Sequence, residues 1–304
     1  TGKDKLAFCG YHGWHDWYLS ANLADDKNLD GHLLPGLKPI GVPRVLKGTA
    51  MPFNYNRIDE LEQIVKNNDI GVIVMEPIRH RRPENGFLKR VRGVADEIGA
   101  VLIFDEISSG WRMNVGGVHE LYETYPDIAV YGKAMSNGFP MAAVVGKGEI
   151  MDIAQESFIS STYWTDRIGP VASIAAINKM LENDVPSHLC KIGNLISEGW
   201  RKLAKEHDLK IDIMDAVPPL TTFVFEYRAD SQALYTLFTQ EMLERGFLAS
   251  KSVYVSDSHA KEHVKKYLEN IDDVFGIIKE VIEKGSVYDL LKGPVAHEGF
   301  KRLT

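Results

Sequence analysis

The chain has 304 residues, of which 44% are hydrophobic and 25% are charged, a balance typical of a folded globular protein. This length is sufficient for two domains. The formal net charge is −7, and the lysines and arginines are interleaved with acids, so we do not expect nucleic acid as a partner. No apolar run is long enough to cross a bilayer, so we expect no membrane association and a cytoplasmic location.

Several common site motifs are absent. The two cysteines, Cys9 and Cys190, do not make a disulfide framework. His12 and His15 have HxxH spacing without a third clustered ligand, so we expect no metal. The chain contains neither the phosphate-loop pattern nor the dinucleotide-binding glycine pattern nor a GxSxG nucleophile turn. An unrelated nucleotide binder or a serine hydrolase is therefore disfavoured.

In the first half of the chain, short apolar runs alternate with helical spacing. The predicted strands are residues 6–9, 70–75, 101–104, 128–131 and 141–145. Residues 57–67 and 87–98 are predicted helices, and Gly99 is the stop signal of the second. Residues 25–52 are rich in Gly, Pro, Asn and Asp and predict a long irregular segment, which is typical of a lid or binding loop.

This alternation predicts an α/β fold with a mostly parallel sheet and helices on both faces. Ligands of such sheets bind outside the carboxyl ends of the strands. Tyr11, Glu76, Asp105 and Lys133 all lie at or just after predicted strand ends. Their convergence at one edge is a stronger indication of a site than any one of them alone.

From about residue 169 the pattern changes. Residues 172–181 and 189–206 predict a long or broken helix, interrupted at Pro186. A strand over residues 221–227, a helix over 231–245 and a last helix that Ser258 caps and that ends near residue 284 complete a smaller α+β domain. We therefore predict a large domain over residues 1–168, and a connecting helix with a small domain over 169–304.

The residues at the predicted edge suit pyridoxal phosphate. Lys133 can form a Schiff base, Asp105 can pair with the pyridine nitrogen, and the ring of Tyr11 can stack on the cofactor. Each has a plainer interpretation: a surface lysine at a turn, a capping aspartate and a core tyrosine. Ile107 is likewise either a core residue or one that packs on a face of the cofactor ring.

As an ordered set, the motifs resemble class III pyridoxal-phosphate aminotransferases of fold type I, and most closely their glutamate-1-semialdehyde aminomutase-like branch. The set spans nearly the whole chain. It comprises Tyr11-His12-Gly13-Trp14-His15-Asp16, Glu76-Pro77, the run from Leu102 to Glu106 with Gly110 and Arg112, Lys133 with Gly138 and Pro140, and the run from Ser160 to Thr165.

The resemblance implies a role for each matching residue. Lys133 would be the Schiff-base lysine and Asp105 the partner of the pyridine nitrogen. Tyr11 and Ile107 would cover the two faces of the ring, and Glu76 would be an active-site glutamate near the cofactor. His12 and Gly13 belong to the same cofactor loop, in which His12 either contacts the cofactor or only shapes the loop. Thr162 would reach the phosphate of the partner subunit, which implies a homodimer.

The implied reaction is transfer of an amino group from a small-molecule donor to a carbonyl acceptor, or an aminomutase reaction on one molecule. The family also has an N-terminal section, with a phosphate-binding turn, before the strand at residue 6, and we expect that section to be missing here. Two alternatives stay open. One is a non-catalytic fragment that keeps the fold and the dimer interface, and the other is a different pyridoxal-phosphate reaction, such as decarboxylation or racemisation.

Overall fold

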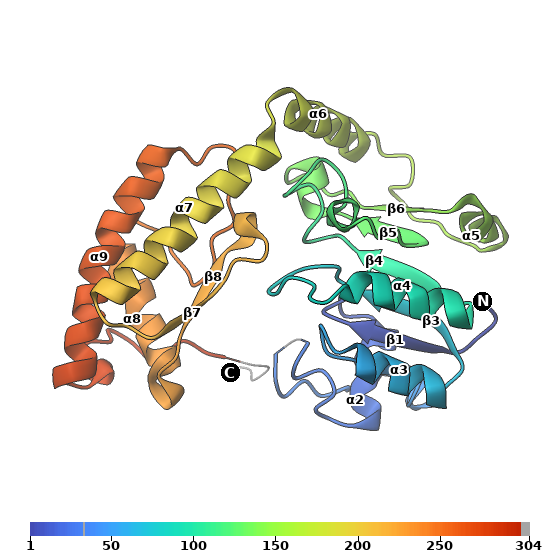
Figure 1. Cartoon of the computed structure of the whole chain (residues 1–304), viewed down its shortest axis with the longest axis horizontal. Helices are drawn as coiled ribbons and strands as arrows, with labels where there is room; N and C mark the ends of the chain where they lie inside the picture. Colours follow the sequence, from blue (N-terminus) through green and yellow to red (C-terminus); the bar gives the residue numbers. More distant parts are fainter. Residues whose placement is uncertain (33, 299–304) are drawn as a thin grey trace. The chain divides into compact units, whose positions relative to one another are not determined.

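The computed structural model describes residues 1–32 and 34–298, which form two compact units, Thr1–Asn183 and Asp184–Glu298. The first unit is built around a sheet with the strand order β2-β1-β3-β4-β5-β6 (Figure 1). The strands are β1 Lys5–Cys9, β2 Ala50–Pro52, β3 Ile70–Met75, β4 Val101–Asp105, β5 Ile128–Tyr131 and β6 Ala143–Gly146. All neighbouring strands are parallel except β5 and β6. The predicted α/β class with a mostly parallel sheet is confirmed.

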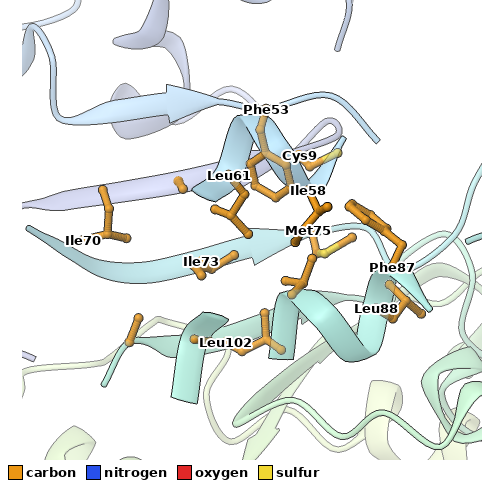
Figure 2. Packing of buried hydrophobic residues seen from close by; sticks show 14 of the residues in the cluster. Cys9, Phe53, Ile58, Leu61, Ile70, Ile73, Met75, Phe87, Leu88 and Leu102 are labelled. Atoms are coloured by element: carbon orange, nitrogen blue, oxygen red, sulfur yellow. The ribbon is translucent and has the colours of Figure 1, made fainter. Parts of the chain in front are cut away.

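Successive residues of a strand point to opposite faces of the sheet, and a buried apolar cluster lies on each face. Ala7 and Cys9 of β1 belong to one buried cluster, with helices α3 Ile58–Asn67 and α4 Phe87–Ile98 (Figure 2). Phe8, between them, belongs to the cluster on the other face, which includes residues of the short helices α1 Asp16–Leu19 and α2 Ala21–Ala24.

The remaining segments of the first unit connect or follow these strands. They are the 3₁₀ helices η1 Arg44–Leu46, η2 Val118–Tyr122, η3 Lys133–Ser136 and η4 Asp152–Glu156, and the helices α5 Gly148–Met151 and α6 Ile168–Glu182. Helix α4 ends at Ile98, and Gly99, the predicted stop signal, follows it with a left-handed backbone. Helix α6 packs on η3 and belongs to the first unit. The predicted boundary after residue 168 stays a prediction.

The second unit combines three long helices with a two-stranded antiparallel sheet. Its main elements are α7 Val185–Glu206, β7 Ile211–Met214, β8 Thr222–Phe225, α8 Ser231–Glu244 and α9 Lys261–Lys284, with η5 Pro218–Leu220, η6 Arg228–Asp230 and η7 Val287–Asp289 between or after them. Trp200 of α7 and Phe223 of β8 are fully buried in its core, where their rings meet edge to face. The described residues contain no helix long and apolar enough to span a membrane.

Two predicted boundaries were wrong. The predicted break in the helix exists, but it lies between Glu182 and Val185 and not at Pro186, which is in the first turn of α7, where its missing N–H costs no hydrogen bond. Ser258 is not the N-cap of α9, because this helix begins at Lys261. There, Nδ1 of His263 accepts a hydrogen bond from the backbone N–H of the N-cap residue Ala260, as the third residue of a helix does in a capping box.

The prediction of an irregular segment over residues 25–52 was wrong at its end, because Ala50–Pro52 form β2, a three-residue edge strand too short to give a clear sequence pattern. The segment between α2 and β2 is anchored to the sheet through His32. The Nδ1 atom of His32 accepts a hydrogen bond from the N–H of Gly10, directly after β1, at 3.2 Å. The His32 ring also packs on Phe8. Burial, helped by the nearby His12, lowers the pKa of His32 to about 4. The anchor therefore requires a neutral imidazole.

This anchor predicts a pH-dependent stability. Because the pKa of His32 is about 4 in the folded chain and near the ordinary 6.5 in the unfolded chain, the unfolded state binds more protons between these values. The free energy of unfolding should therefore fall as the pH drops from about 6.5 to 4, by up to about 3 kcal/mol from this residue. Urea denaturation at a series of pH values measures it.

The variant His32→Asn keeps an acceptor for the Gly10 N–H without a titrating ring, so its stability should depend less on pH in this range. His15→Asn, which changes an exposed histidine of the neighbouring loop, serves as the matched control and should keep the pH profile of the parent chain. Identical pH profiles for His32→Asn and the parent chain would contradict the assignment.

Candidate active site

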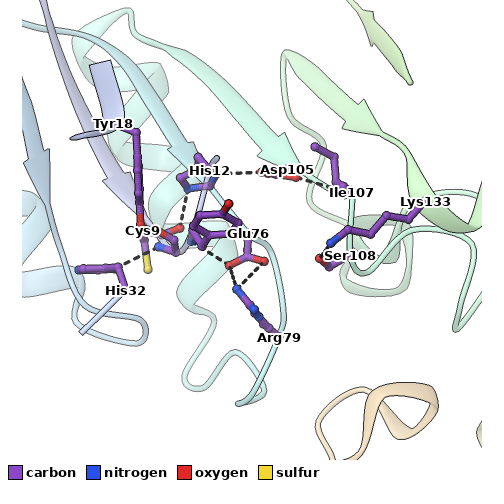
Figure 3. A network of polar contacts seen from close by, with 12 residues as sticks. Cys9, His12, Tyr18, His32, Glu76, Arg79, Asp105, Ile107, Ser108 and Lys133 are labelled. Atoms are coloured by element: carbon purple, nitrogen blue, oxygen red, sulfur yellow. Dashed lines mark hydrogen bonds and ion pairs between the residues drawn. The ribbon is translucent and has the colours of Figure 1, made fainter. Parts of the chain in front are cut away.

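The parallel register brings the predicted residues to one edge of the sheet. Cys9 and Met75 are paired in register at the ends of β1 and β3, and Asp105 ends β4. The loop that follows β1 carries Tyr11 and His12, and β5 is followed by Gly132 and Lys133. Figure 3 shows that side chains from these separate strand ends lie close together.

Asp105 is held by donors on both of its oxygens. The backbone N–H of Ile107 donates to Oδ1 at 3.0 Å, and Nδ1 of His12 lies 2.9 Å from Oδ2. The other ring nitrogen of His12, Nε2, lies 3.0 Å from the carbonyl oxygen of Cys9. Because a carbonyl oxygen only accepts, Nε2 carries a proton, and the bond between Nδ1 and Asp105 holds the second proton of the pair. The sequence left the role of His12 open, and the structure places it against Asp105.

Glu76 directly follows β3 and is buried. Its Oε2 accepts a hydrogen bond from the backbone N–H of Tyr11 at 3.1 Å, and Arg79 forms an ion pair with it at 3.2 Å. The carboxylate fits against Gly10, where a Cβ atom would lie 2.6 Å from Oε2. Gly10 also has a φ of 107°, a conformation that disfavours any other residue. Both the close contact with Glu76 and the backbone conformation therefore require a glycine at position 10.

Lys133 has a left-handed backbone, with a φ of 46°, which costs energy for a non-glycine residue. Strain of this kind persists where the surrounding structure enforces it and is frequent at functional sites. Here the packing of α6 on η3 holds the segment that begins with Lys133. The amine of Lys133 donates a hydrogen bond to the hydroxyl of Ser108 at 2.6 Å.

The electrostatic surroundings favour a neutral, nucleophilic amine. Although the side chain of Lys133 reaches solvent, the protein removes part of its water, and this desolvation lowers its pKa below the ordinary lysine value. The positive charges of Arg79 and Arg112 lower it further, whereas Glu76 and Asp105 oppose the shift. All four of these groups therefore act on the same amine.

The other predicted residues are placed less tightly. The ring of Tyr11 lies edge-on to Trp14 and Tyr18. Gly13 has a φ of 93° beside His15. Ile107 lies beside the backbone of Gly132, since a Cβ atom there would be 3.5 Å from its Cγ2. Thr162 lies in an exposed turn.

Two residues of the site were missed from the sequence. They are Ser108, which follows Asp105 by three residues, and Arg79, which follows the strand-end Glu76 by three residues. A search for polar side chains within a few residues of every predicted strand end would have found both. Within the described ranges, no group of three His, Cys, Asp or Glu residues could hold a metal ion.

A cavity also lies elsewhere, within the second unit. It has a volume of about 740 Å³ and is lined in part by Arg245, Phe247, Tyr254, His259 and Tyr267. None of the predicted site residues lines it, and the charges that act on Lys133 belong to the first unit. The sheet edge therefore remains the site with the relevant chemistry.

The set of groups at the edge fits pyridoxal phosphate. A carboxylate whose two oxygens are both held can face a pyridine nitrogen without turning away. An amine with a lowered pKa can attach to an aldehyde, and a half-buried aromatic side chain can cover a ring. These groups are Asp105, Lys133 and Tyr11.

Comparisons with known proteins agree with this assignment. The chain is 30% identical to the 3-aminobutyryl-CoA aminotransferase of Cloacimonas acidaminovorans, over 93% of this chain and 67% of that protein. It is 29% identical to the glutamate-1-semialdehyde 2,1-aminomutase of Clostridium botulinum, over 88% of this chain and 68% of that protein. It spans about two thirds of the length of these relatives.

Solved structures share the fold. The FumI protein of Sphingopyxis sp. MTA144 superposes with a TM-score of 0.80 at 19% identity, over 95% of this chain and 68% of that one. An omega-transaminase from Sphaerobacter thermophilus gives 0.79 at 20% identity, over 92% and 69%. The family model of class III aminotransferases matches residues 6–275. The predicted resemblance and the fold-type assignment are thereby confirmed, and the chain belongs to the class III aminotransferases, a family that depends on pyridoxal phosphate.

Proposed function

We propose that this chain transfers amino groups at the sheet edge formed by the ends of β1, β3, β4 and β5, with Lys133 as the residue that binds the cofactor and moves the proton. The strained backbone of Lys133, at the end of β5 and among the charges of the other strand ends, carries this proposal. Bound pyridoxal phosphate supplies an electron-withdrawing ring that stabilises negative charge on the carbon next to the substrate nitrogen.

Asp105 is the proposed partner of the pyridine nitrogen. Its negative charge keeps a proton on that nitrogen, which preserves the electron-withdrawing character of the ring. His12 supports it through the bond between Nδ1 and Oδ2, and the carbonyl of Cys9 fixes the orientation of the His12 ring. Since His12 is buried and hydrogen-bonded at both nitrogens, Asp105 is held in one orientation.

Lys133 is the proposed base for the substrate carbon. A neutral amine removes the proton there and returns it at a neighbouring atom, and the lowered pKa of Lys133 raises the neutral fraction near pH 7. Ser108 accepts a hydrogen bond from the amine and so limits the positions that the long side chain samples. Tyr11 and Ile107 are the proposed walls on the two faces of the cofactor ring, beside Gly13 and Glu76.

Two activities occur among the relatives, an aminotransferase and an aminomutase. Both require the same lysine and the same aspartate, and they differ in whether the amino group returns to the same molecule. We propose transfer between a small-molecule amino donor and a carbonyl acceptor, because the relative with the higher identity carries that name. An aminomutase reaction is the second candidate.

The role of Lys133 is tested by adding pyridoxal phosphate, recording the absorbance spectrum, reducing with borohydride and mapping the labelled peptide. A visible absorption band and a reduced adduct on Lys133 are expected. Lys133→Ala should lose the adduct, and amino transfer should fall by about 10²-fold or more, because a positioned base contributes about that much.

Lys191→Ala is the matched control, since it removes an exposed lysine of α7 in the second unit, and it should behave like the parent chain. An adduct on another lysine, or substantial turnover by Lys133→Ala, would exclude the proposed mechanism.

A second copy of the chain is the proposed partner. The segment that contains Thr162 is unusually apolar for an exposed one: Tyr163 is 79% exposed and Trp164 is 67% exposed. Ile168, Val171 and Ile174 follow at a spacing of three residues, so they share a face of α6, and all three are exposed. Exposed apolar segments of this extent mark interaction surfaces. We propose that this segment forms a homodimer interface and brings Thr162 to the cofactor phosphate of the partner.

The dimer is tested by sedimentation at micromolar concentration. The parent chain should sediment with twice the mass of one chain, whereas Val171→Asp should shift it toward one mass, because the charge would be buried in the interface. Val45→Asp introduces the same charge at an exposed valine outside the segment and should leave the mass unchanged. A single mass for the parent chain would rule out this interface.

A further inference from the structure

The loop after β3 carries a run of basic residues, Arg79-His80-Arg81-Arg82, at the edge where Lys133 lies. The loop is anchored from two sides. The hydroxyl of Tyr55 donates to the carbonyl of Pro77 at 2.5 Å, and Ile78 is buried. Further along, the side chain of Asn56 donates to the carbonyl of Arg82 at 3.0 Å. Arg79 thus projects from a fixed backbone.

The guanidinium of Arg79 is used by the protein on one nitrogen only. Its Nη1 atom lies 3.2 Å from Oε2 and 3.5 Å from Oε1 of Glu76. Among the residues that the structure describes, no other group bonds to Arg79, and its side chain is 38% exposed. A guanidinium has five N–H donors in a planar fork, so most of those of Arg79 have no acceptor among the described residues. Figure 3 shows this side chain beyond Glu76.

Glu76 fixes the position of Arg79 without saturating it. The glutamate is itself immobilised by the N–H of Tyr11 and by its close fit against Gly10. Its carboxylate therefore has a fixed position, and it holds Nη1 of Arg79 by an ion pair. The remaining edge of the guanidinium has the geometry that matches a carboxylate through two parallel hydrogen bonds.

The charges near Lys133 suit an anionic ligand. Arg79 is paired with Glu76, and Asp105 is paired with His12. The positive charges of both Arg79 and Arg112 act on the amine of Lys133. A carboxylate held by Arg79 would therefore lie in a positive field while the amino group of the same molecule is at Lys133.

We propose that Arg79 is a specificity-determining residue, which binds a carboxylate of the amino donor with the open edge of its guanidinium. This inference rests on the proposed function, because it concerns the substrate of the same site. It assigns the substrate to the amino acids in the broad sense, meaning amines that carry a carboxylate, and it disfavours simple amines. The same loop offers a matched control, since Arg81 is exposed and also basic.

The first experiment needs no turnover. The chain without cofactor is trace-labelled with acetic anhydride over a range of pH, and labelling of the Lys133 peptide is followed by mass spectrometry. Propionate is the probe, at constant ionic strength. A carboxylate bound to Arg79 cancels a charge that lowers the pKa of Lys133, so propionate should raise the pH of half-maximal labelling.

In Arg79→Gln that pH should already be higher without propionate and should not respond to it. Arg81→Gln should respond like the parent chain. Equal responses in the parent chain and in Arg79→Gln, or no response in either, would overturn the proposal. Inorganic phosphate is run in parallel, and a response through Arg79 to phosphate but not to propionate would overturn the assignment to a carboxylate.

The second experiment uses the chain with pyridoxal phosphate. Alanine, β-alanine and 4-aminobutanoate are each compared with the corresponding amide, which has the same shape without the charge. The carboxylate preference, as a ratio of kcat/KM values for the best pair, should fall by about 10-fold or more in Arg79→Gln, because a hydrogen bond between charged groups contributes about that much. Arg79→Lys should restore part of it, and Arg81→Gln should keep all of it.

A ratio that is unchanged in Arg79→Gln would contradict the proposal. Failure of the proposed function is recognised separately, because then no donor of either kind reacts and no borohydride adduct forms on Lys133. The labelling experiment still decides whether Arg79 binds a carboxylate in that case.

Discussion

The hydrogen bond between His12 and Asp105 joins the ends of β1 and β4, which are not neighbours in the sheet, because β3 lies between them. The loop after β1 must therefore pass the end of β3. At that point the carboxylate of Glu76 accepts a hydrogen bond from the backbone N–H of Tyr11 in this loop. The parallel register of β1, β3 and β4 therefore determines three positions together: those of the loop after β1, of Glu76 and of Asp105.

The buried charges at this edge are paired rather than isolated, which keeps their desolvation cost acceptable. Glu76 has a backbone donor and Arg79, and Asp105 has a backbone donor and His12. Such pairs contribute little net stability, but removal of one partner leaves an uncompensated charge. The edge is thus organised for position more than for stability, as expected where a ligand has to be held at fixed points.

Much of the first unit could be predicted from the sequence because its strands are continuous apolar runs that end in polar residues. The run over residues 70–75 matches β3, and Lys133 follows β5 as expected. Two boundaries in the second unit were less accessible. Pro186 is compatible both with a break and with a first turn, and the cap of α9 comes from a histidine ring three residues inside the helix.

The partners of the site residues could not be predicted, because they depend on three-dimensional contacts. The sequence does not indicate that His12 faces Asp105 across an intervening strand, or that the amine of Lys133 meets Ser108, which is 25 residues away in the chain. Strand order decides both contacts, and order is not encoded in the apolar runs themselves. The residue types were therefore predictable, whereas their pairing was not.

The left-handed backbone of Lys133 has a consequence for how such a chain changes over generations. At a φ of 46° a glycine is the least strained residue, so replacement of the lysine by glycine would relieve the backbone. The backbone conformation alone therefore favours glycine, and selection for the reaction retains the lysine. Where the reaction is no longer selected, descendants of this chain would be expected to lose the lysine and the activity while they keep the fold.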